Sequence, residues 1–102
     1  MKGIYVWKTK PEDGPEFLRR WKEESEVLHS YPGAGGTEIS ESKTEPGLFL
    51  CYARWPSLED REAAVRQRAI DGRDQITSDQ ISELVFGGLF EDAQVIVPPA
   101  QQ

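Results

Sequence analysis

Two side chains of the first predicted helix, Glu24 and His29, could act as a general base. Glu24 lies three residues after Trp21 and four before Leu28, so helical spacing places its carboxyl within an apolar stripe. Burial there would raise the carboxyl pKa and produce a usable base. The alternatives for Glu24 are an ion pair with a lysine or arginine, or a place at the edge of a dimer. His29 has an ordinary pKa of about 6.5 but lies about 100° around the helix from Leu28, where the alternative to catalysis is a solvent-facing ring.

Aromatic residues on the predicted strands and helix could line a cavity for a flat, apolar ligand. Trp7 and Trp55 lie at strand positions, where the same residue type also serves as a core aromatic. Tyr31 stands at the end of the helical stripe, and we expect it to reach the mouth of the cavity. The candidate substrate-binding residues are Trp7, Trp21, Tyr31, Phe49, Cys51 and Trp55.

The single cysteine and the single histidine restrict the metal and redox chemistry. Cys51 cannot form an internal disulfide, and no histidine is placed beside it to create a nucleophile, so we expect a small buried residue. One histidine leaves too few ligands for the usual zinc or haem site, and we expect no metal. Three arginines could attract an anionic substrate or could form a solvated face balanced by acidic neighbours. These arginines are Arg66, Arg68 and Arg73, and the neighbours are Glu59, Asp60 and Glu62.

The length and charge of the chain restrict its class. With 102 residues it fits one domain, which we assign to residues 1–97, followed by a disordered tail at 98–102. The net charge of -6 and the pI of about 4.8 disfavour nucleic acids and anionic membrane surfaces as partners. No apolar run approaches the roughly 18 residues of a membrane span, and the first residues lack the apolar run of a secretion signal. We therefore expect a cytoplasmic protein.

The segment 48–55, LFLCYARW, is predicted to be a strand that is apolar on both faces. Alternation along the strand places Leu50 and Tyr52 on one face and Cys51 and Trp55 on the other. A chain of this length has helices for one face and little to cover the second. We therefore expect a homodimer that packs sheet against sheet, with the Leu50 face in the interface and the Cys51 face as the floor of a cavity.

The remaining elements follow from periodicity and from residues that start or stop helices. Pro15 suits the first turn of one helix, Ser57 caps a second, and Thr77 with Gln80 forms a capping box for a third. The predicted strands are 4–9, 37–43, 48–55 and 89–97, and the predicted helices are 15–31, 58–70 and 77 to about 87. This β-α-β-β-α-α-β order predicts an α+β, ferredoxin-like fold, in which an antiparallel sheet carries its helices on one face. The strand 4–9, with Ile4 and Val6 on one face and Tyr5 and Trp7 on the other, is also apolar on both faces. It should lie in the middle with 48–55, and the polar 37–43 strand at an edge.

Three features resemble the antibiotic biosynthesis monooxygenase family: a helix of FLRRW type, the PGAGG turn, and a strand ending in YARW that is followed by a capped SLED helix. The resemblance extends over residues 4–97. It implies a dimeric α+β barrel. Members that share these features include cofactor-free oxygenases of polyketide anthrones, quinol oxygenases and haem-degrading enzymes, and the fold carries over more readily than the activity.

The resemblance assigns roles to individual positions. Trp55 stands where these enzymes place a tryptophan that lines the cleft, so it joins Glu24 and His29 as a candidate catalytic residue. The anthrone oxygenases typically carry an asparagine four residues before that tryptophan; here the position is Cys51, and a thiol is a weak donor. The haem-degrading members use a histidine on the helix after the tryptophan. That helix has none here, so haem degradation is disfavoured.

The leading hypothesis is a cofactor-independent monooxygenase that uses molecular oxygen on a small aromatic quinol or polyketide-like compound, with Glu24 or His29 as the base. The resemblance implies that no cofactor takes part. Two alternatives stay open. One is a non-catalytic small-molecule-binding or stress-related barrel, and the other is a polyketide isomerase or cyclase-like enzyme that uses the same base without oxygen.

Overall fold

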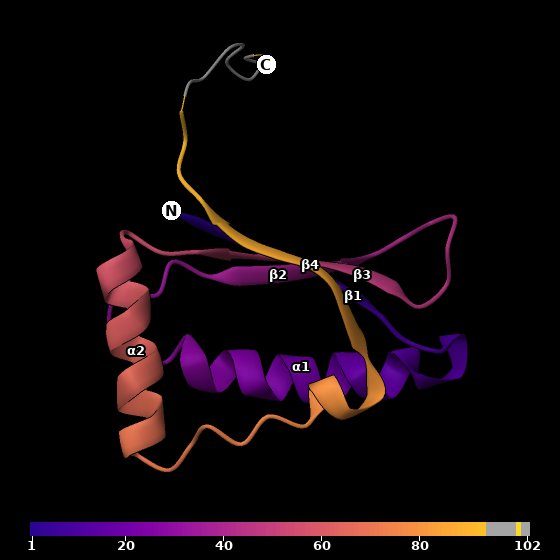
Figure 1. The fold of residues 1–102 in the computed structure, drawn as a ribbon, viewed down its shortest axis with the longest axis horizontal. Coiled ribbons are helices and arrows are strands. Elements are labelled where there is room, and N and C mark those ends of the chain that lie inside the picture. The colour runs from indigo at the N-terminus through magenta and orange to yellow at the C-terminus, as the bar shows by residue number, and fades with distance from the viewer. Residues whose placement is uncertain (94–99, 101–102) are drawn as a thin grey trace.

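The structure is a computed structural model that describes residues 1–93 and 100. This part of the chain forms one sheet with helices packed against it (Figure 1). The strands are β1 (Lys2–Lys8), β2 (Thr37–Glu41), β3 (Leu48–Arg54) and β4 (Glu83–Phe90). The α-helices are α1 (Gly14–Leu28) and α2 (Leu58–Ile70), and two short 3₁₀ helices are η1 (Pro11–Asp13) and η2 (Ser78–Ile81).

The four strands form an antiparallel sheet in the order β2-β3-β1-β4. The two strands that are apolar on both faces are the middle pair, and the polar β2 is an edge strand, as the sequence predicts. Tyr5 pairs with Cys51 and Trp7 with Phe49, so these four side chains share one face of the sheet. Both α-helices lie on one side of the sheet (Figure 1). The predicted α+β architecture is therefore confirmed.

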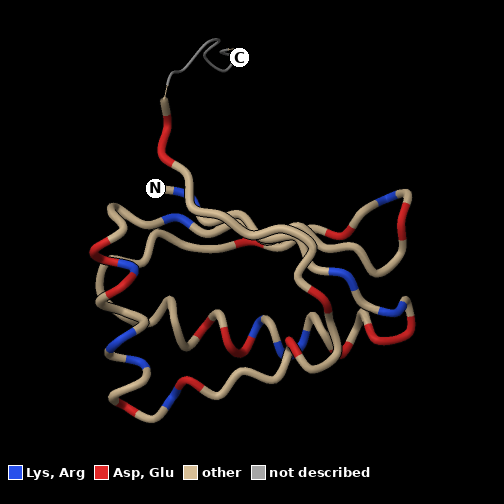
Figure 2. Tube along the Cα trace, viewed as in Figure 1, with Lys and Arg blue, Asp and Glu red and all other residues tan. Residues whose placement is uncertain are grey.

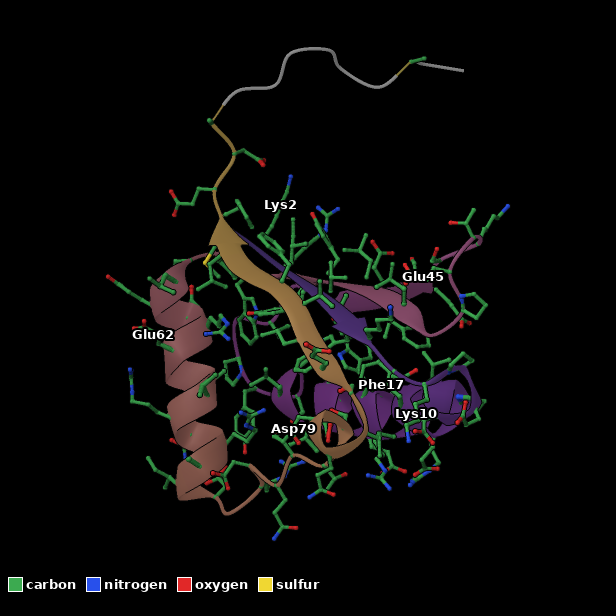
Figure 3. All side chains as sticks on the ribbon, turned by 45° about the vertical axis from the view of Figure 1, so that its right-hand side comes forward. Lys2, Lys10, Phe17, Glu45, Glu62 and Asp79 are labelled. Atoms are coloured by element: carbon green, nitrogen blue, oxygen red, sulfur yellow. The ribbon has the colours of Figure 1, made fainter. Side chains whose placement is uncertain are left out.

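The core lies between the helix-covered face of the sheet and α1. Phe17 of α1 and Phe49 of β3 are fully buried, and their ring centroids are 5.1 Å apart. The Phe17 ring also lies 6.3 Å from the ring of Trp7, and Figure 3 shows Phe17 between α1 and the sheet. On the opposite face of β3, Leu50 leaves 48% of its surface exposed. The predicted division of the 48–55 segment into two faces is correct.

The helix α1 occupies most of its predicted range. Pro15 lies in its first turn, directly after η1. The helix ends at Leu28 rather than at Tyr31, because the backbone N–H groups of Ser30 and Tyr31 donate to carbonyls three residues back instead of four. His29 is consequently the C-cap residue, and its backbone N–H still donates a hydrogen bond of 2.8 Å to the carbonyl of Ser25.

The helix α2 has the predicted bounds, and Ser57 caps it. The Ser57 Oγ accepts a hydrogen bond of 3.1 Å from the Asp60 N–H and donates one of 2.8 Å to the Asp60 carboxylate. Ala64 is the only buried residue of this helix, and Ile70 at its end is 75% exposed. Glu62 points away from the rest of the molecule (Figure 3). The helix therefore packs lightly, as its thin apolar face predicts.

The third helix predicted from Thr77 is wrong. This segment forms only the 3₁₀ turn η2, and the Thr77 side chain makes no capping hydrogen bond. The final strand starts at Glu83 instead of residue 89, because the apolar run after η2 pairs with β1, with Phe86 opposite Val6. The predicted strand therefore shares only residues 89 and 90 with β4. Its residues 94–97, and residues 98, 99, 101 and 102 of the predicted tail, lie outside the described residues.

Charged residues gather on the helices and turns, whereas the strands are mostly uncharged (Figure 2). In α1, Arg19 and Arg20 both bond to the carboxylate of Glu16. In the part of the chain that the structure describes, no helix combines the length and the apolar character needed to cross a membrane.

Candidate ligand-binding cavity

A cavity of about 190 Å³ lies between the helix-covered face of the sheet, α1, α2 and the segment that leads into β4. Tyr5 and Trp7 reach it from β1, and Trp21 reaches it from α1. Strand pairing explains the floor, because Tyr5 lies opposite Cys51 on the neighbouring strand. Aromatic walls with a few polar groups are the usual composition of a small-molecule site.

Five of the predicted site residues line this cavity. They are Trp7, Trp21, Glu24, His29 and Cys51. Trp7 and Cys51 come from the two middle strands, Trp21 and Glu24 come from α1, and His29 caps the end of α1. Residues far apart in the chain are therefore brought to one cavity by the antiparallel sheet and the helix across it.

The other three predicted site residues lie elsewhere. Trp55 is buried behind His29, and the two ring centroids are 5.1 Å apart. Phe49 is fully buried in the core. The hydroxyl of Tyr31 donates a hydrogen bond of 2.7 Å to the carboxylate of Asp71. It therefore links the segment after α1 to the end of α2, and Tyr31 does not line the cavity.

The His29 side chain brings a nitrogen without a partner to the cavity. Its Nδ1 is buried and has no hydrogen-bond partner among the described residues. Burial lowers the pKa of the imidazole below its ordinary value of 6.5. The ring is therefore neutral at physiological pH, and one of its nitrogens carries a free lone pair. The solvent-facing position that the helical angle suggested is not the one observed.

The carboxylate of Glu24 connects α1 to the segment before β4. Its Oε1 accepts hydrogen bonds from the backbone N–H groups of Thr77 at 2.7 Å and Ser78 at 2.9 Å. One turn earlier in the helix, Arg20 donates a bond of 3.1 Å to the carbonyl of Thr77. Glu24 thus satisfies N–H groups at the start of η2 that the Thr77 side chain leaves unsatisfied. It forms part of the cavity wall as a capping group.

Cys51 lies on the cavity floor as a buried, free thiol. Burial raises the pKa of this thiol from 9.0 to about 12. The thiolate, which is the nucleophilic form, is therefore scarce at neutral pH. The prediction of a small buried residue is confirmed.

Six polar residues that line the cavity were not among the predicted site residues: Tyr5, Ser25, Thr37, Tyr52, Arg68 and Ser78. The Tyr5 hydroxyl accepts a hydrogen bond of 3.2 Å from Nη2 of Arg61. Arg68, for which the sequence left a solvated face and an anionic substrate open, lines the cavity, and its Nε is buried without a hydrogen-bond partner in residues 1–93 and 100. The sequence contained a signal for the inward position of Arg68, because Arg61, Ala64 and Arg68 recur at helical spacing on one face of α2.

The cavity can support proton transfer and the binding of an oxygen atom. His29 and Arg68 both line it, and their side chains carry an imidazole and a guanidinium. Within residues 1–93 and 100, no group of three or more His, Cys, Asp or Glu side chains is placed to hold a metal ion.

These features define a ferredoxin-like α+β protein with a small-molecule cavity between its sheet and helices. The family model described as antibiotic biosynthesis monooxygenase matches residues 4–71. The chain therefore belongs to the antibiotic biosynthesis monooxygenase family. No curated protein matches the chain in sequence.

Solved structures share this fold at low sequence identity. SnoaB, a cofactor-independent oxygenase from Streptomyces nogalater, has a TM-score of 0.75 and 15% identity, with 93% of this chain and 94% of SnoaB covered. A mutant of SnoaB has a TM-score of 0.76 and 14% identity over the same shares. A structure described as an antibiotic biosynthesis monooxygenase has a TM-score of 0.64 and 17% identity, with 93% and 100% covered. At these identities, the likeness shows the fold.

Proposed function

We propose that the protein is a cofactor-independent monooxygenase that oxidises a small aromatic quinol or polyketide-like compound in this cavity. The observation that carries the proposal is the neutral His29, whose buried Nδ1 has no partner among the described residues. Trp7 and Trp21 provide apolar walls beside it, and such walls favour a flat aromatic substrate. Membership of the monooxygenase family and the fold shared with SnoaB support the same reaction class.

In the proposed reaction, His29 removes a proton from an activated CH₂ group of the substrate. The resulting carbanion passes one electron to O₂, and the substrate radical and superoxide combine to form a carbon-bound peroxide. The proton returns from His29 to the peroxide, whose O–O bond then breaks with loss of water to leave a carbonyl. The sum is R₂CH₂ + O₂ → R₂C=O + H₂O. All four electrons that reduce O₂ come from the substrate carbon, so no external reductant is required.

We assign the base to His29 rather than to Glu24. The Glu24 Oε1 already accepts two backbone hydrogen bonds, so this oxygen is held by Thr77 and Ser78. His29 is neutral and accepts no hydrogen bond at Nδ1. Trp55 holds the imidazole from behind at 5.1 Å between ring centroids, which gives Trp55 a positioning role.

Oxygen uptake with a panel of anthrones and quinols tests this function. Wild type should consume O₂ with at least one substrate, and His29→Gln should lower kcat by about 100-fold or more, which is the usual contribution of a general base. Glu26→Gln, on the exposed side of α1, is the control and should match wild type. Absence of uptake with every substrate would overturn the oxygenase. Product formed without oxygen would favour the isomerase or cyclase reading.

One observation favours the non-catalytic alternative. The cavity floor carries the Cys51 thiol, which burial keeps protonated and which is a weak donor for a substrate oxygen. A protein that only binds the ligand does not need a stronger donor there. Calorimetric binding of the same anthrones and quinols, with no O₂ uptake and no product, would support this alternative.

We also propose that a second copy of the chain covers the uncovered face of the sheet. Leu50, Phe86 and Phe90 expose 48%, 47% and 44% of their surfaces, and their pairing partners Val6 and Lys2 place them on this face. Native mass at micromolar concentration should be twice the 11.5 kDa of one chain. Leu50→Lys should yield monomer, whereas Ile70→Lys on α2 should not. A wild-type monomer would contradict this proposal.

A further inference from the structure

Arg68 reaches the cavity from the inner face of α2. Ala64, one turn earlier, is buried against the molecule, and Arg61, two turns earlier, donates to the hydroxyl of Tyr5. These residues share a helix face with Arg68. Arg68 lines the cavity, whereas its neighbour Arg66 is exposed to solvent.

The Nε–H of Arg68 is a buried donor without an acceptor. No hydrogen-bond partner of Nε occurs in the described part of the chain, and none of the ion pairs found in residues 1–93 involves Arg68. By contrast, Arg19 and Arg20 bond to Glu16. Leaving a buried donor of a charged group unsatisfied is costly. A ligand oxygen bound to the guanidinium would give Arg68 the anionic partner that those ion pairs do not provide.

The chemistry of the guanidinium selects the kind of oxygen. Arginine stays charged at any physiological pH and only donates hydrogen bonds. Hydrogen bonds between a guanidinium and an anionic oxygen are about twice as strong as those between neutral groups. Glu24, the acidic residue of the same cavity, directs its Oε1 at the N–H groups of Thr77 and Ser78, so that oxygen is already occupied by donors other than Arg68.

We propose that Arg68 determines specificity for a ligand whose flat aromatic body carries an anionic oxygen, either a carboxylate or a phenolate. The oxygen accepts a hydrogen bond from the guanidinium of Arg68, while Trp7 and Trp21 contact the aromatic body. The inference rests on the proposed function in that both use this cavity. It deepens that function by naming the charge of the substrate. Binding of such a ligand can be measured without catalytic turnover.

Calorimetry under anaerobic conditions tests the inference without the oxygenase reaction. The probes are naphthoate, its neutral analogue naphthamide, and nitrophenolate, at about pH 8 where both acids are ionised. Wild type should bind at least one anion about tenfold more tightly than naphthamide. A preference for naphthoate assigns a carboxylate, and a preference for nitrophenolate assigns a phenolate.

Variants of α2 separate Arg68 from the general charge of the helix. Arg68→Gln should lose the preference for anions and keep its affinity for naphthamide, Arg68→Lys should restore part of the preference, and the control Arg66→Gln should match wild type. Thermal unfolding of each variant checks that it is folded. Equal wild-type affinity for the anions and naphthamide would overturn the inference, and so would equal naphthoate binding by Arg68→Gln and Arg66→Gln. Anion preference without O₂ uptake would overturn only the oxygenase.

Discussion

The carboxylate of Glu24 lies 2.9 Å from the backbone nitrogen of Ser78, 54 positions later in the chain, and accepts its hydrogen bond. The same oxygen accepts a second bond of 2.7 Å from Thr77. Because β4 begins soon after η2, this pair of bonds links α1 to the point where the chain returns to the sheet. A carboxylate with this capping role explains why a charged residue lies inside the apolar stripe of a helix.

Removal of this carboxylate should lower the stability of the fold. Glu24→Ala leaves two N–H groups without their acceptor, and we expect the free energy of unfolding to fall by about 1–2 kcal/mol. Glu24→Gln keeps one acceptor oxygen, so its free energy of unfolding should fall by less. Urea denaturation measures the free energy of unfolding of the two variants. Glu26→Ala removes an exposed carboxylate from the same helix and serves as the control; an equal loss in Glu24→Ala and Glu26→Ala would contradict the capping role.

The stability of the protein should depend on pH through His29. Burial lowers the folded-state pKa below 6.5, so between the two pKa values the unfolded chain binds more protons than the folded chain. The free energy of unfolding therefore rises with pH across this window, and the contribution is lost as the pH falls through the folded-state pKa. Because the chain has one histidine, His29→Gln should flatten the curve of stability against pH between about pH 7 and 5. Parallel curves for the two proteins would exclude this coupling.

The Cys51 thiol should resist alkylation while the protein is folded. At about pH 8, a thiol with a pKa of about 12 has roughly a thousandfold less thiolate than one with the ordinary value of 9.0. Iodoacetamide should therefore label the native protein very slowly and the urea-unfolded protein quickly, as followed by mass spectrometry. The sequence has no other cysteine, so a single mass increment reports this residue alone. Equal rates in the two states would show an accessible thiol.

The sequence predicted the sheet well because its signals are local. Alternation along residues 48–55 identified the two faces of β3, and Ser57 marked the start of α2. The prediction of a helix after Thr77 failed where the N–H group of Thr77 bonds to the distant Glu24 and not within a local capping box. Gly87, where the predicted third helix ends, instead lies on β4, where a Cβ would come within 3.1 Å of the Tyr5 ring.

The cavity was harder to predict because it depends on where elements end and cross. His29 is the C-cap residue of α1, and its ring lies 5.1 Å from that of Trp55, a contact that depends on how the helix packs against the chain after β3. The surroundings of Arg68 and Trp55 could not be predicted for a related reason. Nothing in the sequence states that α2 turns Arg68 inward while Trp55 lies behind His29, because both outcomes depend on how the helices pack across the sheet.

The turn that leads into β3 should tolerate no side chain at Gly47. This residue has a φ of +86°, and a Cβ built on it would lie 2.5 Å from the backbone oxygen of Thr9. The Thr9 N–H also donates a bond of 2.8 Å to the Gly47 carbonyl, which holds the ends of β1 and β3 together. We expect Gly47→Ala to lower the free energy of unfolding by about 3 kcal/mol or more, since it combines backbone strain with a backbone clash.

Gly72 provides the matched control for this prediction. Its φ of +69° is also in the left-handed region, but a Cβ there would meet nothing within 4 Å. Gly72→Ala should therefore show the conformational cost alone, about 1 kcal/mol. Urea denaturation of the two variants isolates the clash as the difference between them. Similar losses would mean that the β1–β3 junction shifts to accept a side chain, and the close approach of Thr9 would then not restrict position 47.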